Sequence, residues 1–139
     1  MKKTYLKQTK IRKIKISDVS IDWVNWLNDK QIVQFSKQKN NRHTLSSQKK
    51  FVKKKLEEKN SVLYGIFFED NHIGLVELDL IDKFNKNCEI SYFIGEKNLW
   101  GKDIASIAIN MALNEAFNKL GILKVYAGVY SNNYPSHRV

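Results

Sequence analysis

Apolar and polar residues alternate early in the chain and then take up a helical spacing. The stretch from Ile11 to Ile16 alternates, which predicts a basic first strand. Ser17 and Asp18 then open a predicted helix with inward positions at Val19, Trp23, Trp26 and Leu27. A second helix is predicted to begin after Thr44, with Leu45, Val52 and Leu56 on its buried side. We interpret both tryptophans as packing residues, and the alternative is that either helps to wall an acceptor pocket.

Strand patterns replace helical ones in the middle of the chain. Val62–Phe68 and residues 72–81 are predicted to form a hairpin around a turn at residues 69–71, and residues 88–94 to form a third strand. Gly74, Val76, Leu78 and Leu80 share one face of the second strand. Two acids, Glu77 and Asp79, fall on its other face, and Glu89 lies inside the third strand. Either these acids line a polar cleft or they face solvent from an antiparallel sheet.

Residues 95–105 join the third strand to a long helix and carry glycine at positions 95 and 101. Backbone N–H groups at a helix start, together with the positive end of the helix dipole, favour anions such as phosphate. The inward positions of this helix are Ile104, Ile107, Ala108, Met111, Ala112 and Ala116. Gly121 is expected to end the helix, and residues 124–129 to form a strand parallel to the third. The sequence therefore predicts a β-α-β unit with a phosphate-type loop.

This loop matches neither of the two common nucleotide-binding patterns. A nucleoside-triphosphate loop has four residues between its glycines, followed by Gly-Lys and a serine or threonine. Here five residues separate Gly95 from Gly101, and Asp103 replaces the hydroxyl residue. A dinucleotide loop needs three glycines at fixed spacing, and only Gly101 fits.

The chain is basic, with a formal net charge of +10 over 139 residues. Of its 24 Lys and Arg residues, only Arg12, Arg42 and Arg138 are arginine. Proteins that read nucleic acids rely on the planar fork of arginine, so we do not expect a nucleic-acid partner. The densest lysine run, residues 49–55, is interpreted as the solvated face of a helix. His43 is interpreted as a solvated loop histidine, with a place at a substrate mouth as the alternative.

Other classes of protein are disfavoured by what the sequence lacks. No apolar stretch reaches the roughly 18 residues of a membrane span, and the basic N-terminus is not followed by the apolar run of a signal peptide. We therefore expect a cytoplasmic protein without a membrane partner. Cys88 is the single cysteine, so we expect neither an internal disulfide nor a zinc knuckle, and no metal.

Several segments, taken in order, resemble the GNAT superfamily of acetyltransferases. They are residues 26–29, 72–74, 89–92, 99–105, 116–117 and 125–136. Within the superfamily, the resemblance is to the branch that contains the ribosomal-protein N-terminal acetyltransferases. It implies an α/β fold with a central mixed sheet, mostly antiparallel, with a β-α-β unit and helices on both faces. It also implies one acetyltransferase domain over residues 1–139, truncated before the last helix and strands of that fold.

The resemblance further implies which residues bind acetyl-coenzyme A as co-substrate. The loop at residues 98–105 is expected to bind the pyrophosphate through Asn98, Trp100, Gly101, Lys102, Asp103, Ile104 and Ala105. The strand edge at Tyr92, Phe93 and Ile94 is expected to pair with the pantetheine amides, and Asn133 and Ser136 to hold the same arm. Asp103 departs from the family, which usually has glycine there, and its charge is unfavourable beside a pyrophosphate.

Acetylation of an amine needs a group that accepts the proton of an alkylammonium. Glu89 is the first candidate, because its place in the strand resembles that of the family's acid, and the alternative is a glutamate merely paired with a lysine. Glu77 is the second catalytic candidate, and Asp79 a further group to hold the ammonium. The expected acceptor is an amino group of a nucleotide-linked sugar. The alternatives are a protein N-terminus, a polyamine, or a silent domain that only binds coenzyme A, and a homodimer stays open.

Overall fold

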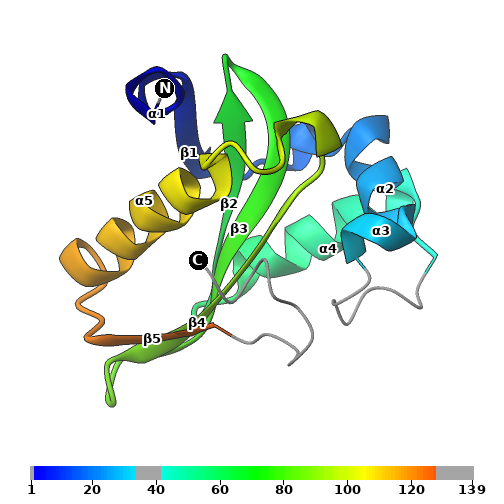
Figure 1. The fold of residues 1–139 in the computed structure, drawn as a ribbon. Coiled ribbons are helices and arrows are strands. Elements are labelled where there is room, and N and C mark those ends of the chain that lie inside the picture. Colours follow the sequence, from blue (N-terminus) through cyan, green and yellow to red (C-terminus); the bar gives the residue numbers. More distant parts are fainter. Residues whose placement is uncertain (1, 34–41, 128–139) are drawn as a thin grey trace.

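The computed structural model describes residues 2–33 and 42–127 (Figure 1). The chain begins with helix α1 (Lys2–Gln8), strand β1 (Thr9–Lys13), a 3-10 turn η1 (Ile16–Asp18) and helices α2 (Ile21–Asn28), α3 (Lys30–Val33) and α4 (Leu45–Glu57). Strands β2 (Val62–Phe68), β3 (Asn71–Asp82) and β4 (Asn87–Ile94) follow. A second 3-10 turn η2 (Lys97–Leu99) leads to helix α5 (Ile104–Asn118) and strand β5 (Lys124–Ala127).

One sheet contains all five described strands, in the order β1-β2-β3-β4-β5. Neighbouring strands from β1 to β4 are antiparallel, whereas β4 and β5 are parallel because α5 connects them. The predicted hairpin, the third strand and the β-α-β unit are thus confirmed. Gly121 has a φ of +67 just after α5, as expected of a residue that ends a helix.

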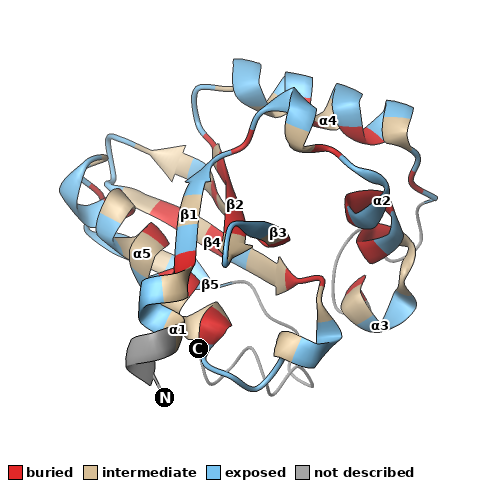
Figure 2. Ribbon diagram, turned by 90° about the horizontal axis from the view of Figure 1, so that it is seen from above, coloured by how far each residue is buried: buried red, intermediate tan, exposed pale blue. Residues whose placement is uncertain are grey.

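Helices cover both faces of the sheet, as predicted, and each face has its own core (Figure 2). Val76, Leu78 and Ile90 face α5, whose alanines at 108, 112 and 116 are fully buried and allow close approach to the strands. Leu75, on the other face of β3, packs with residues of α2, α3 and α4. None of the described helices is long and apolar enough to cross a membrane.

The N-terminal elements differ from the prediction. Helix α1 was not anticipated, and β1 ends at Lys13 instead of continuing to Ile16, which is exposed in the turn η1. Helix α2 begins at Ile21 with Ser20 as its N-cap, because the Ser20 hydroxyl accepts a hydrogen bond from the backbone N–H of Trp23. Ser17 and Asp18 therefore do not open this helix, and the Asp18 carboxylate binds Arg12 instead.

Helix α4 starts where the sequence predicts, with Thr44 as its N-cap in a capping box with Ser47. Val52 is completely buried, as expected, but Leu56 is 52% exposed, so its predicted inward position is wrong. Four lysines of the run are exposed, namely Lys49, Lys50, Lys53 and Lys54. Lys55, in contrast, is half-buried and forms ion pairs with acids of the sheet. The prediction of a solvated lysine face thus holds except at Lys55.

This difference between two apolar positions of α4 gives a stability prediction. Val52→Ala should lower the free energy of unfolding by about 2 kcal/mol, because it leaves a cavity in the core between α4 and the sheet. Leu56→Ala, the matched control on the same helix, should change it by less than about 0.5 kcal/mol. Urea unfolding measures both, and equal losses would contradict this placement of the helix.

Candidate functional site

The predicted phosphate loop leaves the sheet at Gly95, which is buried. Its N–H donates a 2.6 Å hydrogen bond to the carbonyl of Ile73 on the neighbouring strand β3. A Cβ at this position would overlap the indole of Trp26, so only glycine fits beneath α2. Trp23 and Trp26 are both buried, at 0% and 5% exposure, which confirms them as packing residues.

Two side-chain contacts hold the loop after Gly95. The indole Nε1 of Trp100 donates a 2.9 Å hydrogen bond to the carbonyl of Ile94, the last residue of β4. The Lys97 ammonium lies 2.7 Å from the Asp29 carboxylate at the end of α2, and this contact lowers the pKa of Asp29. Sequence reasoning missed this ion pair, since nothing local relates two residues so far apart in the chain.

The loop then reaches the N-terminus of α5 with a backbone suited to an anion. Gly101 and Asp103 both have positive φ, at +77 and +64. Asp103 occupies the N-cap position of α5, but its side chain makes no capping hydrogen bond. The first N–H groups of a helix have no partner within the helix, so those of Ile104 and Ala105 can face a ligand. The Ile104 side chain is buried in the core, and thus only its backbone is available.

Three acids gather on the sheet face opposite α5. In the β3–β4 register Glu77 lies beside Ser91 and Asp79 beside Glu89, while Glu89 also lies beside Tyr126 of β5. The sequence therefore placed Glu77 and Asp79 correctly on one face of β3, and the register adds Glu89 to that face. They lie in a chain with a net charge of +10, which makes a local excess of acids a distinctive feature of this face.

Lys55 of α4 reaches into this group of acids. Its Nζ lies 2.7 Å from Glu77, 3.4 Å from Glu58 and 3.6 Å from Asp79. Burial raises the pKa of Glu77, and the neighbouring Lys55 ammonium offsets part of that rise. Burial also acts to lower the pKa of Lys55, but Glu77, Asp79 and Glu58 together raise it above its ordinary value. Glu77 therefore has a lysine, Lys55, as its ion-pair partner.

Glu89 differs from Glu77 in this respect. No residue in the described ranges forms an ion pair or a side-chain hydrogen bond with its half-buried carboxylate. The simple pairing with lysine that was the alternative for Glu89 therefore does not occur among these residues. Glu89 is thus a half-buried carboxylate on a face with other acids.

Three more of the expected cofactor residues are the last residues of β4. The Tyr92 and Ile94 side chains pack toward α5, while the Phe93 ring meets the Trp26 indole at a centroid distance of 6.1 Å. Over the described residues, β4 pairs with β5 only from Asn87 to Ile90, so residues 92–94 lie past the last of these pairs. Asn133 and Ser136 lie outside the described residues.

His43 corrects one expectation, because it is buried at 6% exposure and not solvated. Its Nδ1 lies 2.9 Å from the Gln48 side chain, which in turn accepts a hydrogen bond from the Trp23 indole. The Asn28 side chain bonds both backbone groups of His43. These partners come from separate helices, so no local pattern in the sequence indicates them.

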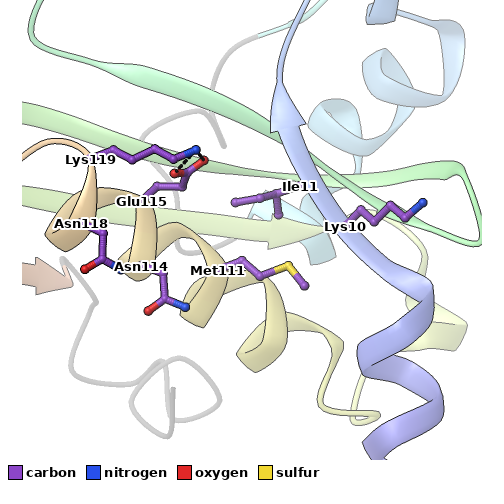
Figure 3. Close-up of a pocket in the computed structure, with 7 residues that line it drawn as sticks. All are labelled: Lys10, Ile11, Met111, Asn114, Glu115, Asn118 and Lys119. Carbon is purple, nitrogen blue, oxygen red and sulfur yellow. Dashed lines mark hydrogen bonds and ion pairs between the residues drawn. The ribbon is translucent and has the colours of Figure 1, made fainter.

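Other places for a ligand do not coincide with these residues. An open cleft lies between β1 and α5, and Figure 3 shows the Glu115–Lys119 ion pair at its side. Its lining residues are Lys10, Ile11, Met111, Asn114, Glu115, Asn118 and Lys119, none of which is a candidate from the sequence. Within residues 2–33 and 42–127, no group of three or more His, Cys, Asp or Glu residues is placed to hold a metal ion.

The loop at the N-terminus of α5 and the acids beside β4 flank one strand from two sides. A helix start whose first backbone N–H groups have no partner within the helix thus lies at the carboxyl end of β4, and carboxylates lie along the same strand. Residues 9–139 match the family model described as the acetyltransferase (GNAT) domain. The chain belongs to this acetyltransferase family.

Similar proteins agree with this assignment. The protein named uncharacterized N-acetyltransferase p20, from Bacillus licheniformis, is 36% identical over 67 residues, which are 48% of this chain and only 37% of that protein. A spermidine N-acetyltransferase from Vibrio cholerae, solved with CoA and spermine, superposes with a TM-score of 0.82 at 22% identity, over 95% of this chain and 77% of that one. A ribosomal L7/L12 alpha-N-protein acetyltransferase in complex with coenzyme A superposes with a TM-score of 0.85 at 16% identity, over 94% of this chain and 76% of that one. At these identities the two structures show the common fold.

The Lys55 ion pairs predict a pH-dependent stability. Lys55→Met should lower the free energy of unfolding at pH 7.5 by about 2 kcal/mol, because it leaves neighbouring carboxylates without their cation. The loss should shrink as the pH falls to 5, since the raised pKa of Glu77 lets the folded state take up a proton. Lys54→Met, at an exposed position of the same helix, is the control. Urea unfolding at both pH values tests this, and a loss that does not vary with pH would contradict it.

Proposed function

We propose that this chain transfers an acetyl group from acetyl-coenzyme A to a primary amine. The observation that carries the proposal is the loop at residues 95–103, which is held by the hydrogen bonds of Gly95 and Trp100 and delivers uncapped backbone N–H groups at the start of α5. The residues present fit a pyrophosphate, because the loop residues Asn98, Gly101 and Lys102 are exposed and no side-chain hydrogen bond caps the helix start.

In this proposal, each element of the site has one role. Acetyl-coenzyme A supplies an activated thioester. The N–H groups at Ala105 and its neighbours bind its pyrophosphate, and the end of β4 at residues 92–94 offers backbone groups to its arm. Glu89 accepts the proton of the ammonium, directly or through water, so that the amine nitrogen can attack. The six residue steps from Gly95 back to Glu89 span roughly 20 Å of extended chain, and this is the distance that the arm of the cofactor has to cover.

The acids on the sheet face favour a cationic acceptor. Glu58, Glu77 and Asp79 provide three carboxylates around the ammonium of Lys55, and Glu89 lies beside Asp79 on the neighbouring strand. Such a face attracts an amine with further positive charges, such as a polyamine, and repels the diphosphate of a nucleotide-linked sugar. A polyamine is therefore the acceptor that we propose first, ahead of the nucleotide-linked amino sugar and the protein N-terminus.

A thiol-release assay with acetyl-coenzyme A tests the function directly. The acceptors are spermidine, amino sugars, nucleotide-linked amino sugars and peptides with a free N-terminus, each at several ionic strengths. We expect turnover to be fastest with the polyamine and to slow as salt increases. Acetyl-coenzyme A should also raise the melting temperature, because it binds only the folded state. If millimolar cofactor produces neither thiol release nor a thermal shift, the proposal is wrong.

Glu89→Gln tests the proton acceptor. The substitution keeps the shape of the side chain and removes its basicity, so kcat should fall by about a hundredfold while cofactor affinity changes little. Glu77→Gln is the comparison, because Glu77 already has Lys55 as a partner. Glu77→Gln should raise KM for a cationic acceptor. A pH–rate profile that is the same in wild type and Glu89→Gln assigns the proton transfer to another group.

Asp103 is the residue at which this chain departs from its family, and two variants separate its charge from its backbone. Its φ of +64 suits glycine, and loss of its side chain removes no capping bond. Asp103→Gly should tighten acetyl-coenzyme A binding by about tenfold, or roughly 1.4 kcal/mol, by removing a negative charge near the pyrophosphate. Asp103→Asn should gain nearly as much, and 3′-dephospho-coenzyme A should gain like the full cofactor. If calorimetry finds no gain in either variant, the carboxylate points away from the ligand.

A further inference from the structure

The imidazole of His72, at the start of β3, lies in a cage of three aromatic rings. It stacks on Phe67 at a centroid distance of 4.9 Å and meets Trp26 at 5.2 Å and Trp23 at 5.6 Å, both edge-on. Its Nε2 lies 2.9 Å from the carbonyl of Gly74. A carbonyl only accepts hydrogen bonds, so Nε2 carries the ring hydrogen. Nδ1 then has no hydrogen and carries a lone pair. This Nδ1 is buried without a hydrogen-bond partner.

The surroundings of this ring favour its neutral form. Burial lowers the pKa of His72, and the Gly74 carbonyl and the Asp18 charge oppose that effect less strongly. The charged groups that face the ring are Asp18 from η1 and Arg12 from β1, and these two are bound to each other by a pair of 2.8 Å hydrogen bonds. From α2, β2 and β3 the ring meets only aromatic side chains and a backbone carbonyl.

His72 lies directly behind the start of the cofactor loop. Trp26, which contacts the imidazole on one side, covers Gly95 on the other. Ile73, the next residue after His72, accepts the N–H of Gly95. Both contacts that fix Gly95 therefore depend on residues that His72 touches or adjoins.

We propose that His72 is a positioning residue for the cofactor loop, whose neutral ring holds Trp26 and Ile73 in the places from which they fix Gly95. This inference rests on the proposed function as far as the ligand is concerned. Protonation gives Nδ1 an N–H with no acceptor in the cage, and a buried donor without a partner is unfavourable. The ring then moves toward water, and the contact between Trp26 and Gly95 loosens. The stabilisation from the neutral ring is complete above the ordinary histidine pKa of 6.5 and is lost as the pH falls through the lower folded-state value.

Hydrogen exchange of the protein without cofactor tests whether the neutral His72 ring holds Gly95 in place. At pH 7.5 and 5.5, the protection of the Gly95 amide is compared with that of α5 amides, each corrected for intrinsic exchange rates. In wild type the Gly95 protection should fall by about fivefold relative to α5 at pH 5.5, since one pKa unit corresponds to a tenfold change in population. His72→Phe fills the cage without titrating and should keep the ratio within about twofold, and His72→Gln serves if that variant does not fold. His43→Phe, at a buried histidine outside the cage, should behave like wild type. A constant ratio in wild type overturns the proposal.

Calorimetry adds the link to the ligand. The probe is acetyl-3′-dephospho-coenzyme A, because it lacks the phosphomonoester that itself titrates near pH 6. Wild type should bind it several-fold more weakly at pH 5.5 than at 7.5, and His72→Phe should show no such change. Loosened exchange with an unchanged affinity refutes the link between His72 and cofactor binding. Absence of binding by every variant at both pH values refutes the proposed function and leaves the exchange result as a separate test of the cage.

Discussion

The contact between the Trp26 indole and Gly95 is the constraint on which the rest of the site depends. At this point α2 lies directly on the backbone where β4 ends, and no side chain larger than hydrogen fits between them. Because the contact fixes the end of β4, it also fixes where the loop begins. The Asp29–Lys97 ion pair and the Trp100 hydrogen bond then hold the next turns of the loop against the same two elements. A solvent-exposed ion pair contributes little by itself, so the buried indole carries most of this organisation.

Local pattern was sufficient to predict the elements of the second half of the chain. The apolar run in β2, the alternation in β3 and β4 and the glycine that ends α5 are short-range signals, and each led to the observed element. The errors come from interactions between distant segments. Leu56 fits the helical period but is exposed, and Lys55, one residue earlier, turns inward because acids of β3 attract it. Helix α1 lacked any signal that distinguished it from a basic tail.

The candidate site shows the same division between local and distant effects. The sequence placed Glu77 and Asp79 on one face of β3 by strand periodicity, but the face that they share with Glu89 follows from the register between β3 and β4. The sequence ranked Glu89 ahead of Glu77 only by resemblance and did not show that Lys55, from another element, pairs with Glu77. It likewise interpreted His43 as solvated, although partners on α2 and α4 bury it. Spacing along the chain therefore predicts which face a group occupies, and only the fold shows what neutralises it.

Strand β4 joins the two halves of the proposed chemistry because its two faces serve different partners. Cys88, Ile90 and Ile94 face α5 and fix that helix against the strand, so that its N-terminus stands at the strand's carboxyl end. Glu89 and Phe93 face the opposite side, where α2 and the acids of β3 lie. A ligand bound at the start of α5 that follows β4 toward its amino end thus passes from a region of backbone N–H groups to a region of carboxylates. The first suits a phosphate-bearing carrier and the second a cationic amine, and one strand sets the distance between them.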